Sequence, residues 1–151
     1  MSASVVDWGM DFEDVRAQAA RLSPWCHVAS VTPDGRPHVA PVHPAFEAGT
    51  IWVMTGVDSV KARNVRAHPD VMLHWQVTEV GDNLMVWGRA AVHDDLETKR
   101  RLWTGVFDYD LNLFSPDGPD GSPGTGFLSV EPTRAVFSEF YGIKGRSVWE
   151  P

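Results

Sequence analysis

The stretch Met54-Thr-Gly-Val-Asp-Ser-Val-Lys-Ala-Arg-Asn-Val-Arg-Ala-His-Pro69 decides how the rest of the chain is interpreted. It follows an alternating apolar run at residues 50–55, which is typical of a strand, and Gly56 then breaks that strand. Asp58 is a good N-cap residue, so we expect a short helix to begin directly after it. The pattern therefore predicts a strand that leads into a helix.

The first turn of this expected helix carries a positive charge. Ser59 and Lys61 lie where unpaired backbone N–H groups and the helix dipole favour an anion, so a lysine alone is unfavourable there. Arg63 and Arg66 follow, and residues 59–69 contain no acidic residue in a chain of net charge −7. We interpret the helix start as a phosphate site, with a solvated basic helix face as the alternative.

Length and composition limit the possibilities for the whole chain. The 151 residues predict a single domain, residues 1–151, with tails at 1–10 and 142–151. A single cysteine, Cys26, rules out an internal disulfide, and without an export signal we expect a cytoplasmic location. No apolar run is long enough to span a membrane. The acidic balance, with a pI near 5.2, argues against general binding of nucleic acid.

The remaining periodicity predicts a mainly antiparallel sheet. A packing helix begins after Asp11, and a second helix, with structural charges, begins after Asp94. Pro41 and Pro44 remove backbone donors, so their strand should lie at an edge or bend there. The expected strands cover residues 25–32, 37–46, 50–55, 71–78, 83–92, 127–131 and 134–141. Strands joined in this way usually close into a barrel.

Residue types with catalytic potential do not form a known pattern. The six histidines lack metal-ligand spacing, and His38 and His43 differ in parity on one expected strand, so we expect no metal site. No signature of a nucleophile or of a dinucleotide fold occurs, and no side chain has the setting of a general acid or base. A phosphate site in a barrel without such groups suggests that a redox cofactor supplies the chemistry. The catalytic residues are unknown at this stage.

Several short motifs follow one another along the chain. They are Asp34-Gly-Arg-Pro37, Val39-Ala-Pro-Val42, Met54-Thr55, Ser59-Val-Lys-Ala-Arg-Asn-Val65, His68-Pro-Asp-Val71, Asn83 before Leu84-Met-Val-Trp-Gly88, and Phe114-Ser-Pro-Asp-Gly-Pro-Asp120. In this order they resemble the pyridoxamine 5'-phosphate oxidase-like FMN-binding split-barrel family. Within it, the chain looks like the general stress protein group and the actinobacterial flavin or deazaflavin reductases.

The resemblance implies a six- to seven-stranded antiparallel split β-barrel that forms a homodimer with FMN at the subunit interface. It implies a flavin-dependent oxidoreductase acting on an unknown small acceptor. A deazaflavin-dependent reductase and a non-catalytic flavin-binding or stress-response module are the alternatives. Lys61 corresponds to the family's phosphate-binding lysine, and Asn83 falls where the oxidases have a glutamine facing the flavin. The cofactor-binding residues implied are His38, Val39, Ala40, Pro41, Val42, Met54, Thr55, Ser59, Lys61, Arg63 and Asn83.

The chain also departs from the family pattern at two places. It ends Gly-Arg-Ser-Val-Trp-Glu-Pro, without the Arg-Leu-x-Pro segment and the Arg-x-His pair that hold pyridoxine phosphate in the oxidases proper. The resemblance therefore gives no support for vitamin oxidation. Val60 stands where the oxidases have an arginine, so one phosphate contact is lost or is taken over by Arg63.

Overall fold

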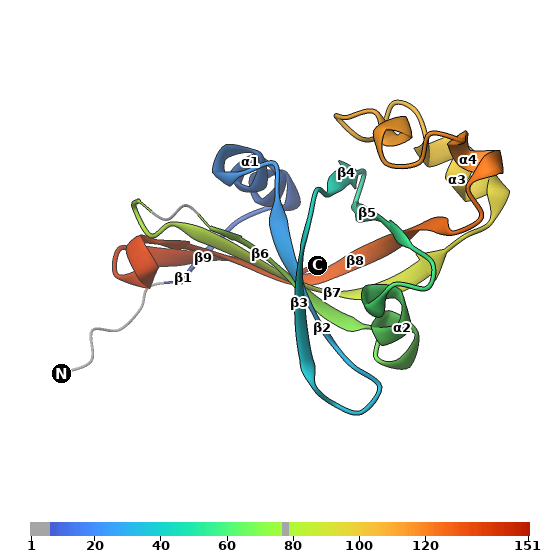
Figure 1. Cartoon of the computed structure of the whole chain (residues 1–151). Coiled ribbons are helices and arrows are strands. Elements are labelled where there is room, and N and C mark those ends of the chain that lie inside the picture. The colour runs from blue at the N-terminus through green and yellow to red at the C-terminus, as the bar shows by residue number, and fades with distance from the viewer. Residues whose placement is uncertain (1–6, 77–78) are drawn as a thin grey trace.

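The computed structural model describes residues 7–76 and 79–151, which form one strongly twisted sheet with helices around it (Figure 1). Within these residues the sheet has nine strands. The strands are β1 (Asp7–Gly9), β2 (Cys26–Val31), β3 (Pro37–Val42), β4 (Ala45–Glu47), β5 (Thr50–Gly56), β6 (Asp70–Gln76), β7 (Asn83–His93), β8 (Thr125–Glu139) and β9 (Gly145–Trp149). The helices are α1 (Phe12–Leu22), α2 (Val60–Ala67), α3 (Leu96–Leu102) and α4 (Gly118–Gly121), with 3₁₀ turns η1 (Leu111–Leu113) and η2 (Phe140–Gly142).

The strand order confirms the mainly β split-barrel fold. The main path is β1-β9-β8-β7-β6-β2-β3, and β5 pairs with both β4 and β8. Among the described strands, β1, β3 and β4 each pair with one neighbour, so the barrel is open and not closed. β3 is therefore an edge strand, as its prolines predict, and the chain bends after Val42 before β4 begins.

One long strand replaces the two strands expected around Pro132. β8 runs without interruption for 15 residues, and the missing N–H of Pro132 lies where the register with β7 shifts next to Gly88. A Cβ atom on Gly88 would lie 2.7 Å from the carbonyl oxygen of Glu131, so only glycine fits at this bulge. The sequence alone predicts a break at Pro132. Whether a strand can contain a proline depends on the strand that pairs with it, and the sequence pattern does not show that partner.

The two expected tails each contain a strand. β1 pairs in parallel with β9, and β9 pairs with the second half of β8. The ring of Trp8 lies against Gly145, at a place that a larger residue could not occupy. Strands of three and five residues show too little alternation to be found in the sequence.

The helices differ from the sequence prediction at three places, two N-caps and one additional helix. α1 begins after Asp11 with a capping box, as expected, but the N-cap of α2 is Ser59, not Asp58. The N-cap of α3 is Asp95, not Asp94. The glycine- and proline-rich segment at 115–126 was expected to lack regular structure, yet it contains α4.

Two apolar clusters hold the elements together. The larger cluster fills the barrel and packs against α1, and includes Ile51, Leu73, Trp75 and Leu84. The smaller one lies beneath α3 and the segment after it, around Trp52, Leu102, Trp103, Leu111 and Phe127. Figure 1 shows α3 and α4 at the right-hand end of the molecule and β1 and β9 toward the left, with α1 above the sheet between them and α2 at the lower right. Among the described residues, no helix is both long and apolar enough to cross a bilayer.

Candidate functional site

A hollow of about 360 Å³ opens where the end of β3, the start of α2 and the segment after α3 meet. Five of the residues singled out in the sequence line it: Pro41, Val42, Met54, Thr55 and Lys61. They come from three elements, β3, β5 and α2. The fold therefore brings part of the expected set together in one place.

Lys61 is the cation of this hollow. Within residues 7–76 and 79–151, the structure gives its ammonium group no hydrogen bond or ion pair. Burial lowers the pKa of Lys61, because desolvation penalises the charged form. A half-buried cation without a partner is unfavourable, and a bound anion would relieve this.

The start of α2 is built around two hydroxyl groups. Ser59 accepts a hydrogen bond from the backbone N–H of Ala62 at 3.2 Å, and its Oγ lies 3.0 Å from Oγ1 of Thr55. The N–H groups of Val60 and Lys61, at the first two helical positions, have no carbonyl partner within the helix. Because the first turn contains no acidic residue, these donors and Lys61 share one electropositive end.

The two arginines of α2 lie elsewhere. Arg66 donates to the backbone oxygen of Val57 at 2.6 Å, so its charge stabilises the turn before the helix. Arg63 is exposed and does not line the hollow.

The expected cofactor-binding stretch 38–42 is divided between the two faces of β3. Val39 is 60% exposed on the outer face, whereas His38 pairs across the sheet with Ser30. Ser30 accepts a hydrogen bond from Asn64, and the buried Nδ1 of His38 has no hydrogen-bond partner among the described residues. Ser59, His38, Val39 and Ala40 do not line the hollow. Pro41 and Val42, the last two residues of β3, line the hollow, whereas residues 38–40 lie earlier in the strand, so position along β3 and not only its alternation decides which residues reach it.

Asn83 lies at the other end of β7 from this hollow. It pairs with Gln76 and Ser138, whereas the hollow reaches Thr125 at the start of β8, near the His93 end of β7. The 11 residues of β7 span about 33 Å. One chain alone therefore does not bring Asn83 to the hollow.

Four aromatic side chains complete the wall and were not predicted: Trp25, His43, Tyr109 and Phe114. The ring centroids of His43 and Tyr109 lie 4.4 Å apart, and those of Tyr109 and Phe114 lie 5.7 Å apart. The wall is assembled from distant segments, so no spacing in the sequence indicates it. Ser115 and Thr125, at the ends of the glycine-rich segment, also line the hollow, with their hydroxyl oxygens 2.7 Å apart.

A carboxylate lies next to His43 of this wall, although the sequence predicts no acid or base. Nε2 of His43 lies 2.7 Å from Oδ1 of Asp108. The neighbouring Tyr109 is a weaker acid than usual, because burial and the charge of Asp108 raise its pKa to about 12. His43 and Asp108 are far apart in the sequence, so only the fold reveals the pair.

Residues 13–138 match the model of a family described as pyridoxamine 5'-phosphate oxidase. No match is found among curated proteins. A Clostridium acetobutylicum protein related to general stress protein 26 of B. subtilis is 16% identical, with a TM-score of 0.75 over 93% of this chain and 96% of that one. A Nostoc punctiforme protein described as pyridoxamine 5'-phosphate oxidase-related and FMN-binding is 16% identical, with a TM-score of 0.66 over 91% and 87%. An F420 reductase is 22% identical, with a TM-score of 0.55 over 76% and 90%. At these identities the solved structures show a shared fold.

Proposed function

Because the chain belongs to the pyridoxamine 5'-phosphate oxidase family, we propose that it is an FMN-dependent oxidoreductase that reduces a small acceptor. The observation that carries the proposal is Lys61, a half-buried cation that lacks a partner among the described residues and lines a hollow at a helix start. Such a position suits a phosphate group. When bound, FMN supplies hydride or electron transfer, and the protein supplies binding and orientation.

The residues around the hollow fit FMN in two parts. The ammonium of Lys61 and the first N–H groups of α2 would hold the phosphate, with Ser59 and Thr55 fixing the helix start. The apolar sides of Pro41, Val42 and Met54 would lie along the ring system. His38, Val39, Ala40 and Arg63, which do not line the hollow, stay in the proposal as neighbours of its residues within β3 and α2. Water would be excluded by the aromatic wall on the other side.

We also propose a two-fold homodimer that completes the site. A second apolar hollow, of about 470 Å³, lies on the outer face of β2, β3, β6 and β7 and contains Val39, Met72 and Met85. A symmetric partner would cover this face, since exposed apolar surface of this kind marks contacts between proteins. In such a dimer Asn83 would serve the hollow of the other copy.

A deazaflavin coenzyme is the second candidate, favoured by one position. Arg63 is an exposed cation two residues after Lys61 in α2, and a longer phosphate-bearing tail that leaves the hollow could reach it. The structural neighbour described as an F420 reductase agrees with this alternative. A non-catalytic flavin-binding module remains the outcome if the bound cofactor cannot be reduced.

The test is the visible spectrum of protein purified from a host that lacks the deazaflavin. We expect a yellow protein that releases FMN on denaturation and whose bound flavin a reduced nicotinamide bleaches. A colourless protein that binds only the added deazaflavin coenzyme would favour the second candidate. A yellow protein that no nicotinamide or deazaflavin donor reduces would contradict the oxidoreductase and leave the binding module.

A further inference from the structure

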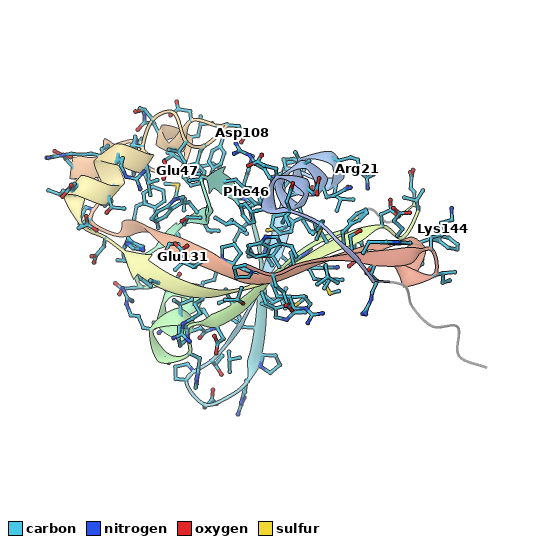
Figure 2. All side chains as sticks on the ribbon, turned by 180° about the vertical axis from the view of Figure 1, so that it is seen from behind. Arg21, Phe46, Glu47, Asp108, Glu131 and Lys144 are labelled. Carbon is cyan, nitrogen blue, oxygen red and sulfur yellow. The ribbon has the colours of Figure 1, made fainter. Side chains whose placement is uncertain are left out.

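His43 stands between two hollows. It follows the end of β3 and lines both the cofactor hollow described above and a smaller one of about 200 Å³ beside α1. Asp108 lines only the smaller hollow, and Tyr109 only the larger. Figure 2 shows Asp108 near Phe46, on the side of α1. The imidazole ring is therefore part of the wall between the two spaces, with its side chain 24% exposed.

The two nitrogen atoms of this ring have different surroundings. Nε2 is buried, makes no well-aligned hydrogen bond, and lies 2.7 Å from Oδ1 of Asp108. A carboxylate at this distance favours the tautomer that carries its proton on Nε2. Because Asp108 belongs to the smaller hollow, Nδ1 is the nitrogen available to a molecule in the larger one.

Ring contacts hold the imidazole in this orientation. Its centroid lies 4.4 Å from that of Tyr109 and 6.1 Å from that of Trp25, the latter edge to face. These contacts oppose rotation of the ring about its side-chain torsion. Burial and the charge of Asp108 raise the pKa of Tyr109 to about 12, which makes its phenol a weaker acid than a free tyrosine and a poor source of a transferred proton.

We propose that His43 is the proton donor to the carbonyl oxygen of a planar acceptor bound in the larger hollow, with Asp108 as its positioning residue. The proposal deepens the proposed function and rests on it. The site it defines is the aromatic wall of His43, Tyr109, Trp25 and Phe114, which suits a flat conjugated ring.

For a carbonyl acceptor, the proposed step transfers one hydride and one proton. The carbonyl carbon, or its conjugated position, gains a hydride with two electrons from the reduced cofactor, and the C=O π electrons move to oxygen. The oxygen takes the proton that leaves Nδ1 of the imidazolium of His43. The ring keeps its proton on Nε2 toward Asp108 and regains one from water at Nδ1 before the next cycle.

Among the described residues, four other titratable side chains line the two hollows that the His43 ring separates or lie beside that ring. Asp108 and Tyr109 lie on the segment after α3, Arg16 lines the smaller hollow from α1, and Lys61 lines the larger one from α2. Of these residue types, histidine is the one that normally changes charge between pH 5 and 8. The matched variant His43→Phe separates a contribution of His43 to any pH dependence of ligand binding from that of the other groups.

The first experiment measures the tautomer without any ligand. In ¹⁵N spectra of histidine-labelled protein at high pH, we expect the neutral His43 ring to carry its proton on Nε2. In Asp108→Asn we expect a mixture of tautomers, because the amide imposes no such preference. A wild-type ring with its proton on Nδ1 would overturn the proposal.

The second experiment measures binding to the FMN-loaded, oxidised protein by calorimetry from pH 5 to 8. The probes are 1-indanone, 1-indanol and indane, which share a ring and differ in the oxygen function. We expect 1-indanone to bind about tenfold more tightly at the acid end, where Nδ1–H can donate. 1-Indanol should show the opposite trend, because a neutral Nδ1 accepts from its hydroxyl, and indane should show none.

The matched variant is His43→Phe, which keeps an aromatic ring between Tyr109 and Trp25. In this variant both pH trends should disappear while indane binds as before. Trends that persist in His43→Phe, or a wild type without trends, would overturn the role of His43. If FMN is not retained at all, the proposed function falls instead, so the two failures are distinguishable.

Discussion

Lys61 is the residue on which the proposed anion site depends. Lys61→Ala should weaken FMN binding by about 1.5 to 3 kcal/mol, the range for a hydrogen bond to a charged group. Quenching of flavin fluorescence on titration measures the change. Lys144→Ala removes an exposed lysine at the far end of β8 and should leave the affinity unaltered. Equal affinities of wild type and Lys61→Ala would remove this residue from the site.

The half-buried charge of Lys61 should also affect the stability of the cofactor-free protein. Burial lowers its folded-state pKa below the unfolded value, so the unfolded chain binds more protons between the two values. At neutral pH the charged Lys61 therefore lowers the free energy of unfolding. This destabilisation decreases as the pH rises toward the pKa that Lys61 has in the unfolded chain. Lys61→Met should raise the free energy of unfolding at pH 7, and the gain should shrink at pH 10. Urea titration at both pH values checks this, and a gain independent of pH would contradict it.

The site residues found from the sequence are those with a local signal. Lys61 and Ser59 stand out because a helix start has its own charge and capping preferences. His43, Tyr109 and Trp25 could not be found, because their proximity depends on how the segment after α3 folds back over β3. A lone histidine after a strand gives no indication of the carboxylate that the fold places beside it.

At the level of elements, the segment from α3 to β8 is held over the hollow by its charged residues. Lys99 is almost completely buried and donates from Nζ to the backbone oxygen of Ser122 at 2.6 Å. Arg100 pairs with Asp120, and Arg101 with Glu47. The charges of α3 were interpreted as structural, and these contacts agree.

This anchoring leads to a prediction about specificity. Replacing residues 117–121 with a shorter glycine linker should alter the preference among quinone-like or conjugated acceptors more than it alters FMN affinity. The reason is that Phe114, Ser115 and Thr125, which flank the replaced residues, line the hollow. Steady-state kinetics with several acceptors, alongside flavin titration, measures both effects. A loss of FMN affinity with unchanged preference would contradict the prediction.

Close contact between elements makes Gly126 irreplaceable. A Cβ atom there would lie 2.6 Å from the backbone oxygen of His93 and 2.8 Å from Val57. Gly126→Ala should therefore destabilise the protein by about 1 to 3 kcal/mol, as overpacking does. Gly124→Ala is the matched control, because nothing lies within 4 Å of its Cβ position. Thermal unfolding compares the two, and equal midpoints would show that β8 can shift.

Most elements were predictable where their period is strong, as in α1, β5, β6 and β7. The errors occur where a partner decides the outcome. Pro132 is tolerated because Gly88 lies opposite it in β7. The short strands β1 and β9 form because they pair with each other and because β9 also pairs with β8. Ser59 caps α2 in place of Asp58, with its hydroxyl next to that of Thr55.

For the whole molecule, the proposed dimer is the main prediction. Light scattering should give twice the chain mass at micromolar concentration. Met72→Arg on the outer face of β6 should give a monomer, because a buried unpaired charge is unfavourable in an interface. Ile143→Arg changes a highly exposed residue outside that face and should remain dimeric. A wild-type monomer would contradict the dimer and leave Asn83 without a role in the cofactor site.

The open shape of the barrel was the least predictable property of the molecule. Tight turns favour closure, yet β3 and β4 remain edges among the described strands. Closure depends on the register and stagger of all strands together, and no local pattern records it.

The length of β8 determines when the site can form during synthesis. Its first half pairs with β5, and its second half pairs with β9 while β7 lies alongside nearly all of it. β5, which carries Met54 and Thr55, thus has its main partner some seventy residues later in the chain. Until that partner is available, a nascent chain contains most residues of the hollow but lacks the strand that holds β5 in the sheet. We therefore expect a chain truncated before residue 125 to be unable to retain flavin, because β5 then lacks its main partner.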